Sequence, residues 1–208
     1  MAAAWSFDSD SLAFSAAVEG NADLYLIPAK GGFPSRVTRT SEDERYPSFS
    51  RDGRWIYFSS RRSGSDQVWR VARKGGTPVQ MTRNGGIDAK ESPDGRFLYF
   101  TKAAFEVGQP GIWRKPLPDG TEERIADSGQ ALQWALLEDD PCYVKEPRSE
   151  KASIECLDVA SRSIRWSAPL EGPGHLWGSL SVSPDGRWML LDRRDSHQGD
   201  LMMVEDFR

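Results

Sequence analysis

Few residues of this 208-residue chain have the types that catalysis or metal binding usually needs. The two histidines, His175 and His197, lie in stretches rich in glycine and polar residues, which predicts surface loops. Neither belongs to a His-x-x-x-His or Glu-x-x-His pattern, the spacings that place two ligands on one metal ion. We therefore expect no metal, no cofactor and no histidine-based catalysis.

A serine hydrolase of the α/β type would need a Gly-x-Ser-x-Gly elbow, which exposes the nucleophile at the end of a strand. The sequence has no such motif, and Gly178-Ser-Leu-Ser-Val182, which resembles it superficially, is interpreted as an inner strand. The chain is accordingly predicted not to be an enzyme.

The two cysteines, Cys142 and Cys156, are predicted to lie on adjacent antiparallel strands joined by a turn centred near Ser149. Cysteines opposite each other on such strands can approach disulfide distance, although the geometry is demanding. Two half-buried thiols that pack as small apolar side chains are the favoured expectation, and a disulfide is the alternative. The sequence has no Cys-x-x-Cys motif, so structural zinc and redox catalysis are unsupported.

Charge is distributed unevenly along the chain, although the net charge is only −4. Residues 51–83 carry eight basic and two acidic side chains, whereas residues 119–158 carry eleven acidic and four basic ones. The basic stretch offers a surface to an anionic partner, but solvated strand faces and loop tips are the favoured interpretation of these charges. Because the chain as a whole is mildly acidic, we expect neither direct nucleic-acid binding nor membrane insertion.

The elements that position these side chains are indicated by a phrase that recurs along the chain. It is written as Tyr46-Pro-Ser-Phe-Ser-Arg-Asp-Gly-Arg-Trp-Ile-Tyr-Phe58, Glu91-Ser-Pro-Asp-Gly-Arg-Phe-Leu-Tyr-Phe100 and Val182-Ser-Pro-Asp-Gly-Arg-Trp-Met-Leu-Leu191. We place its turn aspartate at Asp10, Asp52, Asp94, Asp140 and Asp185, at intervals of 42 to 46 residues. Repeats of this length that carry several short strands are typical of β-propeller blades. The apolar spacing of helical repeats is missing.

The second copy shows how one blade should be built. It predicts strands at Tyr46–Ser50, Trp55–Ser59, Gln67–Ala72 and Pro78–Thr82. An Asp-Gly pair at residues 52 and 53 supplies the positive φ that a tight hairpin turn needs. The strand that begins at Trp55 is apolar without alternation, which predicts that both faces of its sheet are covered, as between neighbouring blades.

Two copies depart from the phrase. The first, which runs from Ser6 to Phe14, is interpreted as shortened by about two residues, with Ser9 in place of the proline. The fourth, Leu137-Glu-Asp-Asp-Pro-Cys-Tyr-Val144, has lost the Pro-Asp-Gly order. The turn therefore tolerates variation.

The tryptophans fall into two groups. Those expected to pack between blades recur at strand positions: Trp55, Trp69, Trp113, Trp166 and Trp188. Trp5, Trp134 and Trp177 lie at or just before inner strands, near where the axial openings of a propeller would be. For these three, packing is the favoured role and ligand binding is the alternative.

The recurring phrase, together with Asp66-Gln-Val-Trp-Arg-Val71 and Gly75-Gly-Thr-Pro-Val-Gln-Met-Thr82, resembles the repeat of the TolB-type, WD40-like β-propeller family. The resemblance covers nearly the whole chain. It implies an all-β fold with about five blades of four antiparallel strands. The blades are placed at residues 5–40, 45–83, 88–126, 132–167 and 178–208, in a single domain.

The positions of the first and last strands lead to a further expectation. Residue 5 already lies in a predicted inner strand, and residues 200–208 match the third strand of a blade. We therefore expect an open or incomplete propeller that is the C-terminal part of a longer protein. The N-terminus lacks the basic and apolar regions of a signal peptide, so a soluble, cytoplasmic protein is the default. A periplasmic location, which is that of TolB, would require a longer native chain.

As to function, the resemblance implies a non-catalytic module that binds a protein partner or a small ligand through its blade loops, as TolB does in an envelope complex. Similar repeats also form the sensory half of bacterial regulators, and this chain fits that role as well. The alternative is the substrate-gating propeller of a prolyl-oligopeptidase-like serine peptidase whose catalytic domain is absent. Because the recurring residues serve the scaffold, binding is expected in loops where the copies differ.

Overall fold

A computed structural model of the chain describes residues 2–102, 109–146, 151–170, 179–183, 185–195 and 198–205. The chain forms two compact units, residues 1–123 and residues 124–208, which we call the first and second units. The described residues form strands and turns, and they contain no helix of the length and apolarity that crossing a membrane requires.

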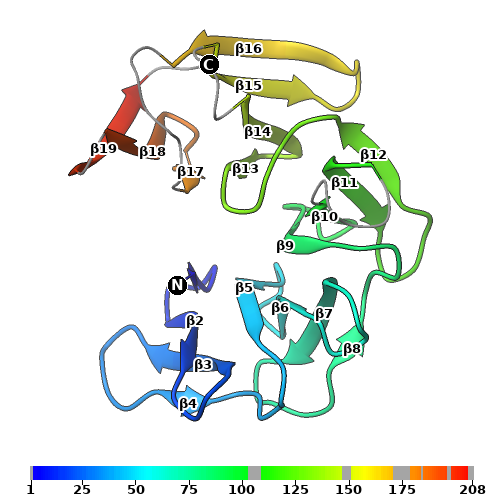
Figure 1. The fold of residues 1–208 in the computed structure, drawn as a ribbon, viewed down its shortest axis with the longest axis vertical. Coiled ribbons are helices and arrows are strands. Elements are labelled where there is room, and N and C mark those ends of the chain that lie inside the picture. The colour runs from blue at the N-terminus through cyan, green and yellow to red at the C-terminus, as the bar shows by residue number, and fades with distance from the viewer. Residues whose placement is uncertain are drawn as a thin grey trace. The chain divides into compact units, whose positions relative to one another are not determined.

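The first unit consists of sheets in which each strand lies beside its sequence neighbour (Figure 1). The first sheet contains β1 (Ala3–Trp5), β2 (Ser11–Ala17), β3 (Ala22–Pro28) and β4 (Ser35–Arg36). The second contains β5 (Glu44–Phe49), β6 (Trp55–Ser60), β7 (Gln67–Ala72) and β8 (Val79–Gln80). The third contains β9 (Ile87–Glu91), β10 (Phe97–Lys102), β11 (Gly111–Pro116) and β12 (Glu123–Ala126), the last of which extends into the second unit.

The second unit follows the same plan. One sheet contains β13 (Trp134–Leu137), β14 (Asp140–Lys145), β15 (Ser153–Asp158) and β16 (Ser163–Pro169). The other contains β17 (Leu180–Val182), β18 (Trp188–Asp195) and β19 (Gln198–Glu205). The predicted all-β fold of four-stranded antiparallel blades is thereby confirmed. That these blades make one domain, and that the propeller is open, stay predictions.

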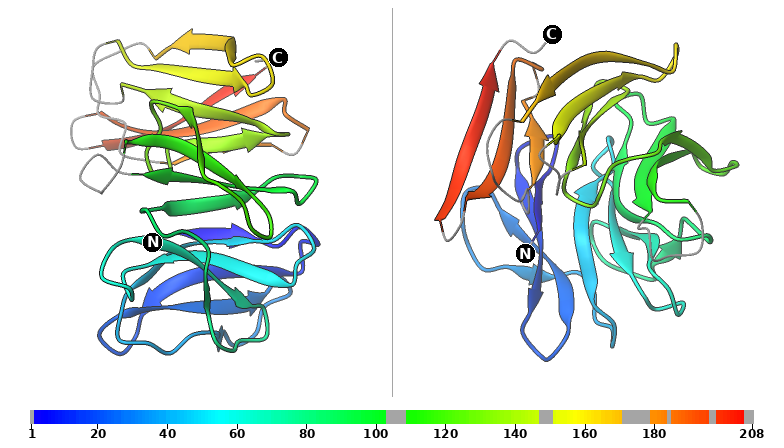
Figure 2. Two further views of the ribbon diagram at one scale, coloured as in Figure 1. Left: turned by 90° about the vertical axis from the view of Figure 1, so that its right-hand side faces the viewer. Right: turned by 45° about the horizontal axis from the view of Figure 1, so that its top comes forward.

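The hydrophobic core lies between neighbouring sheets, and β6 shows why its sequence does not alternate. Ile56 and Phe58 point into a cluster that they share with residues of the first sheet, such as Leu24. Tyr57, between them, points to the other face, where it packs against Leu98 of the third sheet. All of these side chains are buried. Both faces of β6 are therefore covered, as its apolar run predicts, and Figure 2 shows the strands of the first unit in successive layers.

The turn between β5 and β6 is closed by a small polar network. The Ser50 hydroxyl accepts a hydrogen bond from the Trp55 amide at 2.9 Å and donates one to the Asp52 carboxylate at 2.6 Å. The same carboxylate accepts the Arg54 amide at 3.0 Å. Gly53 has φ of 68°, the left-handed conformation that glycine adopts at no steric cost. Serine, aspartate and glycine recur because each fills one of these roles.

The network is repeated at Ser92 with Asp94 and at Ser183 with Asp185, and also in the first copy of the phrase. There, Ser6 donates to Asp8, and the Ser11 amide donates to Ser6. The predicted assignment of this turn is wrong, because Asp8 rather than Asp10 is the turn aspartate. Ser9, with φ of 56°, takes the place of the glycine and not that of the proline, so the first copy is not shortened.

The fourth copy has a different turn. Leu137 pairs directly with Asp140, so that Glu138 and Asp139 alone connect β13 to β14. Glu138 has φ of 58°, a conformation suited to a two-residue hairpin. Asp140, predicted as the turn aspartate, instead accepts the amide of Val159 at 3.0 Å. The loss of the Pro-Asp-Gly order thus reflects a shorter turn.

Candidate functional site

The cysteines prove to be joined. Cys142 of β14 pairs directly with Cys156 of β15, their Cα atoms are 4.0 Å apart, and the two form a disulfide. The predicted strand placement is confirmed, but the favoured expectation of two thiols is wrong. The direct register is the physical reason, because it brings the two side chains to the same face of the sheet at the same level.

Of the other predicted candidates, Trp5 and Trp134 lie within the described residues. His175, His197 and Trp177 lie outside the described residues. Trp134 is completely buried, which confirms a packing role, whereas Trp5 is 60% exposed. No group of three histidine, cysteine, aspartate or glutamate side chains suited to a metal ion occurs in the part of the chain that the structure describes.

The serine and aspartate pairs of the turns resemble catalytic pairs only in residue type. Hydrogen bonds from the Ser6 hydroxyl, the Asp10 amide and Arg73 lower the pKa of Asp8 to about 2. The Ser92 hydroxyl, followed by the backbone and side chain of Arg96, likewise lowers the pKa of Asp94 to about 2. A carboxylate of such low pKa is a poor general base near neutral pH. These groups therefore serve the turns.

A more informative position lies in the inner strands β5 and β9. The pairing of β5 with β6 shifts between Arg45 and Ser48, and Tyr46 within this bulge has φ of 55°. The equivalent residue of β9 is Asp88, with φ of 50°, and Leu132, just before β13, has φ of 68°. Left-handed conformations cost energy for such residues and persist where the surrounding structure imposes them. The copies thus share a backbone conformation while they differ in the side chain that it carries.

Around Tyr46 and Asp88, ion pairs form within the second blade and within β9, and a hydrogen bond joins the second and third sheets of the first unit. Arg45 and Arg61 both contact the Asp66 carboxylate, at 3.1 and 3.0 Å. Lys90 contacts the Asp88 carboxylate at 3.0 Å. The Asp88 amide also donates to the Ser59 hydroxyl at 3.0 Å, which ties β9 to β6. We call Arg45, Tyr46, Arg61, Asp66, Asp88 and Lys90 the basic surface.

The two signs of charge differ in their access to solvent. The Asp66 and Asp88 side chains are each 7% exposed, whereas Arg45, Arg61 and Lys90 are 40%, 54% and 30% exposed. The carboxylates thus lie beneath the cations that they orient. A partner would meet mainly positive charge, even though three cations and two anions nearly balance.

A buried ion pair supports the arginine-rich loop after β6. Arg62 pairs with Glu44, which is fully buried, and its guanidinium lies 4.9 Å from the ring centre of Trp69. The pKa of Glu44 is raised, because burial outweighs the hydrogen bond from Thr38 and the charge of Arg62, which lower it. Removal of either side chain would leave the other as a buried, unpaired group. The pair therefore holds the loop in place.

The sequence indicated part of this surface. Arg61 belongs to the basic stretch of residues 51–83, but Asp88 and Lys90 lie outside that stretch, and Arg45 precedes it. The usable signal was the disagreement of the copies at Tyr46, Asp88 and Leu132. The geometry suits binding, because each carboxylate of the surface is already held by a cation.

Comparisons with known proteins agree with this architecture. The family model described as TolB beta propeller domain matches residues 1–104. An uncharacterized protein of Agrobacterium fabrum is 35% identical over 180 residues, which cover 80% of this chain and 60% of that protein. The chain thus spans less than two thirds of this relative's length.

Solved structures give the same fold. TolB from Acinetobacter baumannii has a TM-score of 0.81 at 23% identity, over 99% of this chain and 51% of that chain. A putative TolB from Agrobacterium tumefaciens has a TM-score of 0.69 at 23% identity, over 88% of this chain and 70% of that chain.

Proposed function

We propose that this chain, which belongs to the TolB β-propeller domain family, is a non-catalytic module that binds an acidic protein partner through the basic surface. The observation that carries this proposal is the difference in exposure between the cations and the carboxylates of the basic surface. Three partly exposed cations stand above two carboxylates that are 7% exposed. Such a surface attracts an acidic partner and orients it.

The residue types of this surface favour a protein over other anionic partners. Tyrosine and arginine are enriched at protein interfaces, where their large side chains supply most of the binding energy. Tyr46 lies beside Arg45, and burial raises the pKa of its phenol, which therefore stays protonated as a hydrogen-bond donor. A nucleic acid would favour a longer row of cations than three, and the chain carries a net charge of −4.

The two more specific roles considered from the sequence, sensor domain and peptidase companion, receive no added support. Neither the family match nor the similar structures named above point to the sensory half of a regulator or to the companion of a serine peptidase. We therefore keep the function at the level of partner binding.

The disulfide bears on the compartment. Disulfides persist mainly in oxidising environments such as the bacterial periplasm. The pair Cys142–Cys156 therefore supports an oxidising compartment, and we propose this in place of the cytoplasmic default, which the comparisons do not support.

A site-specific crosslink tests the proposal. A photoreactive residue at Arg61, introduced into the full chain in its native host, should capture a protein that mass spectrometry then identifies. With that partner purified, Arg61→Glu should raise the Kd at least tenfold, and added salt should weaken binding by the wild type, because exposed charges are screened.

The matched control is Arg54→Glu. Arg54 belongs to the same blade and is 80% exposed, but it lies in the β5–β6 turn at the opposite end of these strands. Its reversal should leave the Kd unchanged. If the two reversals weaken binding equally, or if neither does, the basic surface is not the binding site.

A further inference from the structure

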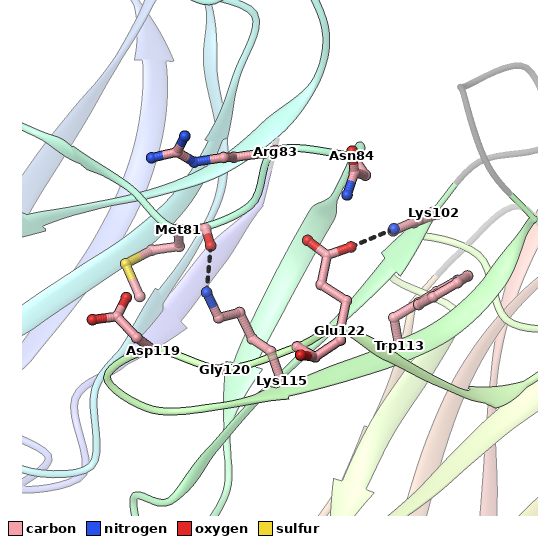
Figure 3. Close-up of a pocket in the computed structure, with 10 residues that line it drawn as sticks. Met81, Arg83, Asn84, Lys102, Trp113, Lys115, Asp119, Gly120 and Glu122 are labelled. Atoms are coloured by element: carbon pink, nitrogen blue, oxygen red, sulfur yellow. Dashed lines mark hydrogen bonds and ion pairs between the residues drawn. The ribbon is translucent and has the colours of Figure 1, made fainter.

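The first unit contains a pocket (Figure 3), and none of the residues of the basic surface lines it. Its volume is about 660 Å³. Met81 and Arg83 line it from the segment after β8, and Lys102 and Lys115 line it from β10 and β11. The turn at residues 119–122 closes another side. A concavity of this size lies within the range that small-molecule sites have.

One of the two lysines in the pocket is fully paired. The Lys102 side chain is 3% exposed, and its ammonium contacts the Glu122 carboxylate at 2.6 Å. It also lies 3.9 Å from the ring centre of Trp113. A buried cation with a carboxylate and an aromatic face has its charge compensated.

Lys115 is also buried but lacks a countercharge. It is 9% exposed, and its ammonium donates to the Met81 carbonyl at 2.9 Å. None of the ion pairs among the described residues includes Lys115. An ammonium group has three donors, and a neutral carbonyl satisfies one of them. Burying a charge without a countercharge is costly. An anion bound in the pocket would compensate the charge of Lys115.

Comparison with the second sheet shows that the scaffold does not need this lysine. Leu98 of β10 pairs with Lys115 of β11 as Ile56 of β6 pairs with Val71 of β7. Val71 is completely buried in the apolar core between the first two sheets. The third sheet therefore has a lysine where the second has a core residue, and that substitution creates the cationic side of the pocket.

We propose that this pocket binds a small molecule whose head group is a carboxylate, held by the free donors of Lys115. Arg83, exposed at the rim, adds a second cation, while Met81 and Trp113 provide apolar surface for the body of the ligand. Asp119, also exposed at the rim, repels groups of higher negative charge such as phosphate. The proposal uses none of the residues of the basic surface, so each can fail without the other.

Titration calorimetry on the whole chain tests the proposal with three probes: phenylacetate, its neutral analogue phenylacetamide, and inorganic phosphate. We expect phenylacetate to bind at least tenfold more tightly than the amide, and phosphate to bind more weakly than phenylacetate. Amide-resolved NMR of the wild type should place the phenylacetate-induced shifts at the Trp113 indole and the Gly120 amide.

Lys115→Met is the decisive variant. Because the buried ammonium of Lys115 lacks a countercharge, an apolar side chain of similar length removes a desolvation cost, so the fold should persist, and phenylacetate affinity should fall at least tenfold. The control is Lys74→Met, at an exposed lysine outside the pocket, which should not change the affinity. Equal binding of acid and amide, tighter binding of phosphate, undetectable phenylacetate binding, or unchanged affinity in Lys115→Met would each overturn the proposal.

Discussion

The β5–β8 sheet and the β13–β16 sheet have the same strand order but are secured in different ways. In the first, the Ser50 hydroxyl and the Asp52 carboxylate satisfy the amides of the turn that follows the inner strand. In the second, that turn has only two residues, and a disulfide between Cys142 and Cys156 joins the two middle strands. Polar turn chemistry and a covalent link thus support one blade geometry.

This difference explains why the recurring phrase can be lost without loss of the blade. A serine–aspartate turn needs a serine, an aspartate and a residue that accepts positive φ, whereas a two-residue turn needs only tolerance of positive φ, here at Glu138. The fold therefore depends on the antiparallel hairpin itself. The residues that make the hairpin recognisable in the sequence are one solution among several.

Removal of the disulfide should have the largest effect on this comparison. Cys142→Ala combined with Cys156→Ala frees a loop with a sequence separation of 14 residues, and such a link contributes about 3 kcal/mol to the free energy of unfolding. Hydrogen exchange should therefore accelerate at amides of β14 and β15. The amides of β6 and β7 should be unaffected.

Reduction provides the control. Dithiothreitol should reproduce the acceleration in the wild type and do nothing to the double variant. Unchanged exchange in β14 and β15 after complete reduction would mean that the two sheets are secured alike.

The polar turn should give the next largest effect. Ser50→Ala removes the acceptor of the Trp55 amide at a position where Ser50 is 2% exposed. A buried donor left without an acceptor costs about 2 kcal/mol, which urea denaturation would measure. The matched change in the other sheet is Ser161→Ala, whose exposed hydroxyl contacts Ser163 and Asp158 and, among the described residues, accepts no buried amide. A loss there as large as that of Ser50→Ala would contradict the role of the turn.

Much of the fold was predictable because the repeat restates the same local chemistry. Gln67–Ala72 was predicted to the residue, and the apolar run from Trp55 correctly indicated a sheet covered on both faces. The turn of the first copy was predicted wrongly because Asp10 was taken as its aspartate, whereas Ser6 donates its hydrogen bond to Asp8. Ser9 hides the glycine signal, since it adopts positive φ without being glycine.

The candidate sites were less predictable, because they depend on how deeply each side chain is buried as well as on its place in the sequence. The sequence shows that Arg61 and Asp66 are close along the chain, but not that the carboxylate is buried beneath the guanidinium. The lysine at 115 follows Arg114 in a charged run, and only strand register reveals that it occupies a core position. Likewise, opposed strands allowed a disulfide, but the direct register of Cys142 with Cys156 decided it.

Acid should weaken the serine–aspartate turns but not the β13–β14 hairpin, which has no such turn. Of the three predicted effects, this should be the smallest. The Ser92 hydroxyl, the Arg96 amide and the Arg96 side chain lower the pKa of Asp94 from 3.8 to about 2. A carboxylate whose pKa is depressed by folding stabilises the native state above its unfolded pKa, and this contribution is lost as pH falls toward the folded value. The NMR shift of the Arg96 amide, which donates to Asp94 at 2.9 Å, should therefore titrate with a midpoint near 2, and Asp94→Asn should abolish that titration. The amide of Cys142, in the sheet without this network, should show no such step, and a midpoint near 3.8 at Arg96 would show that the turn does not hold the carboxylate in its charged form.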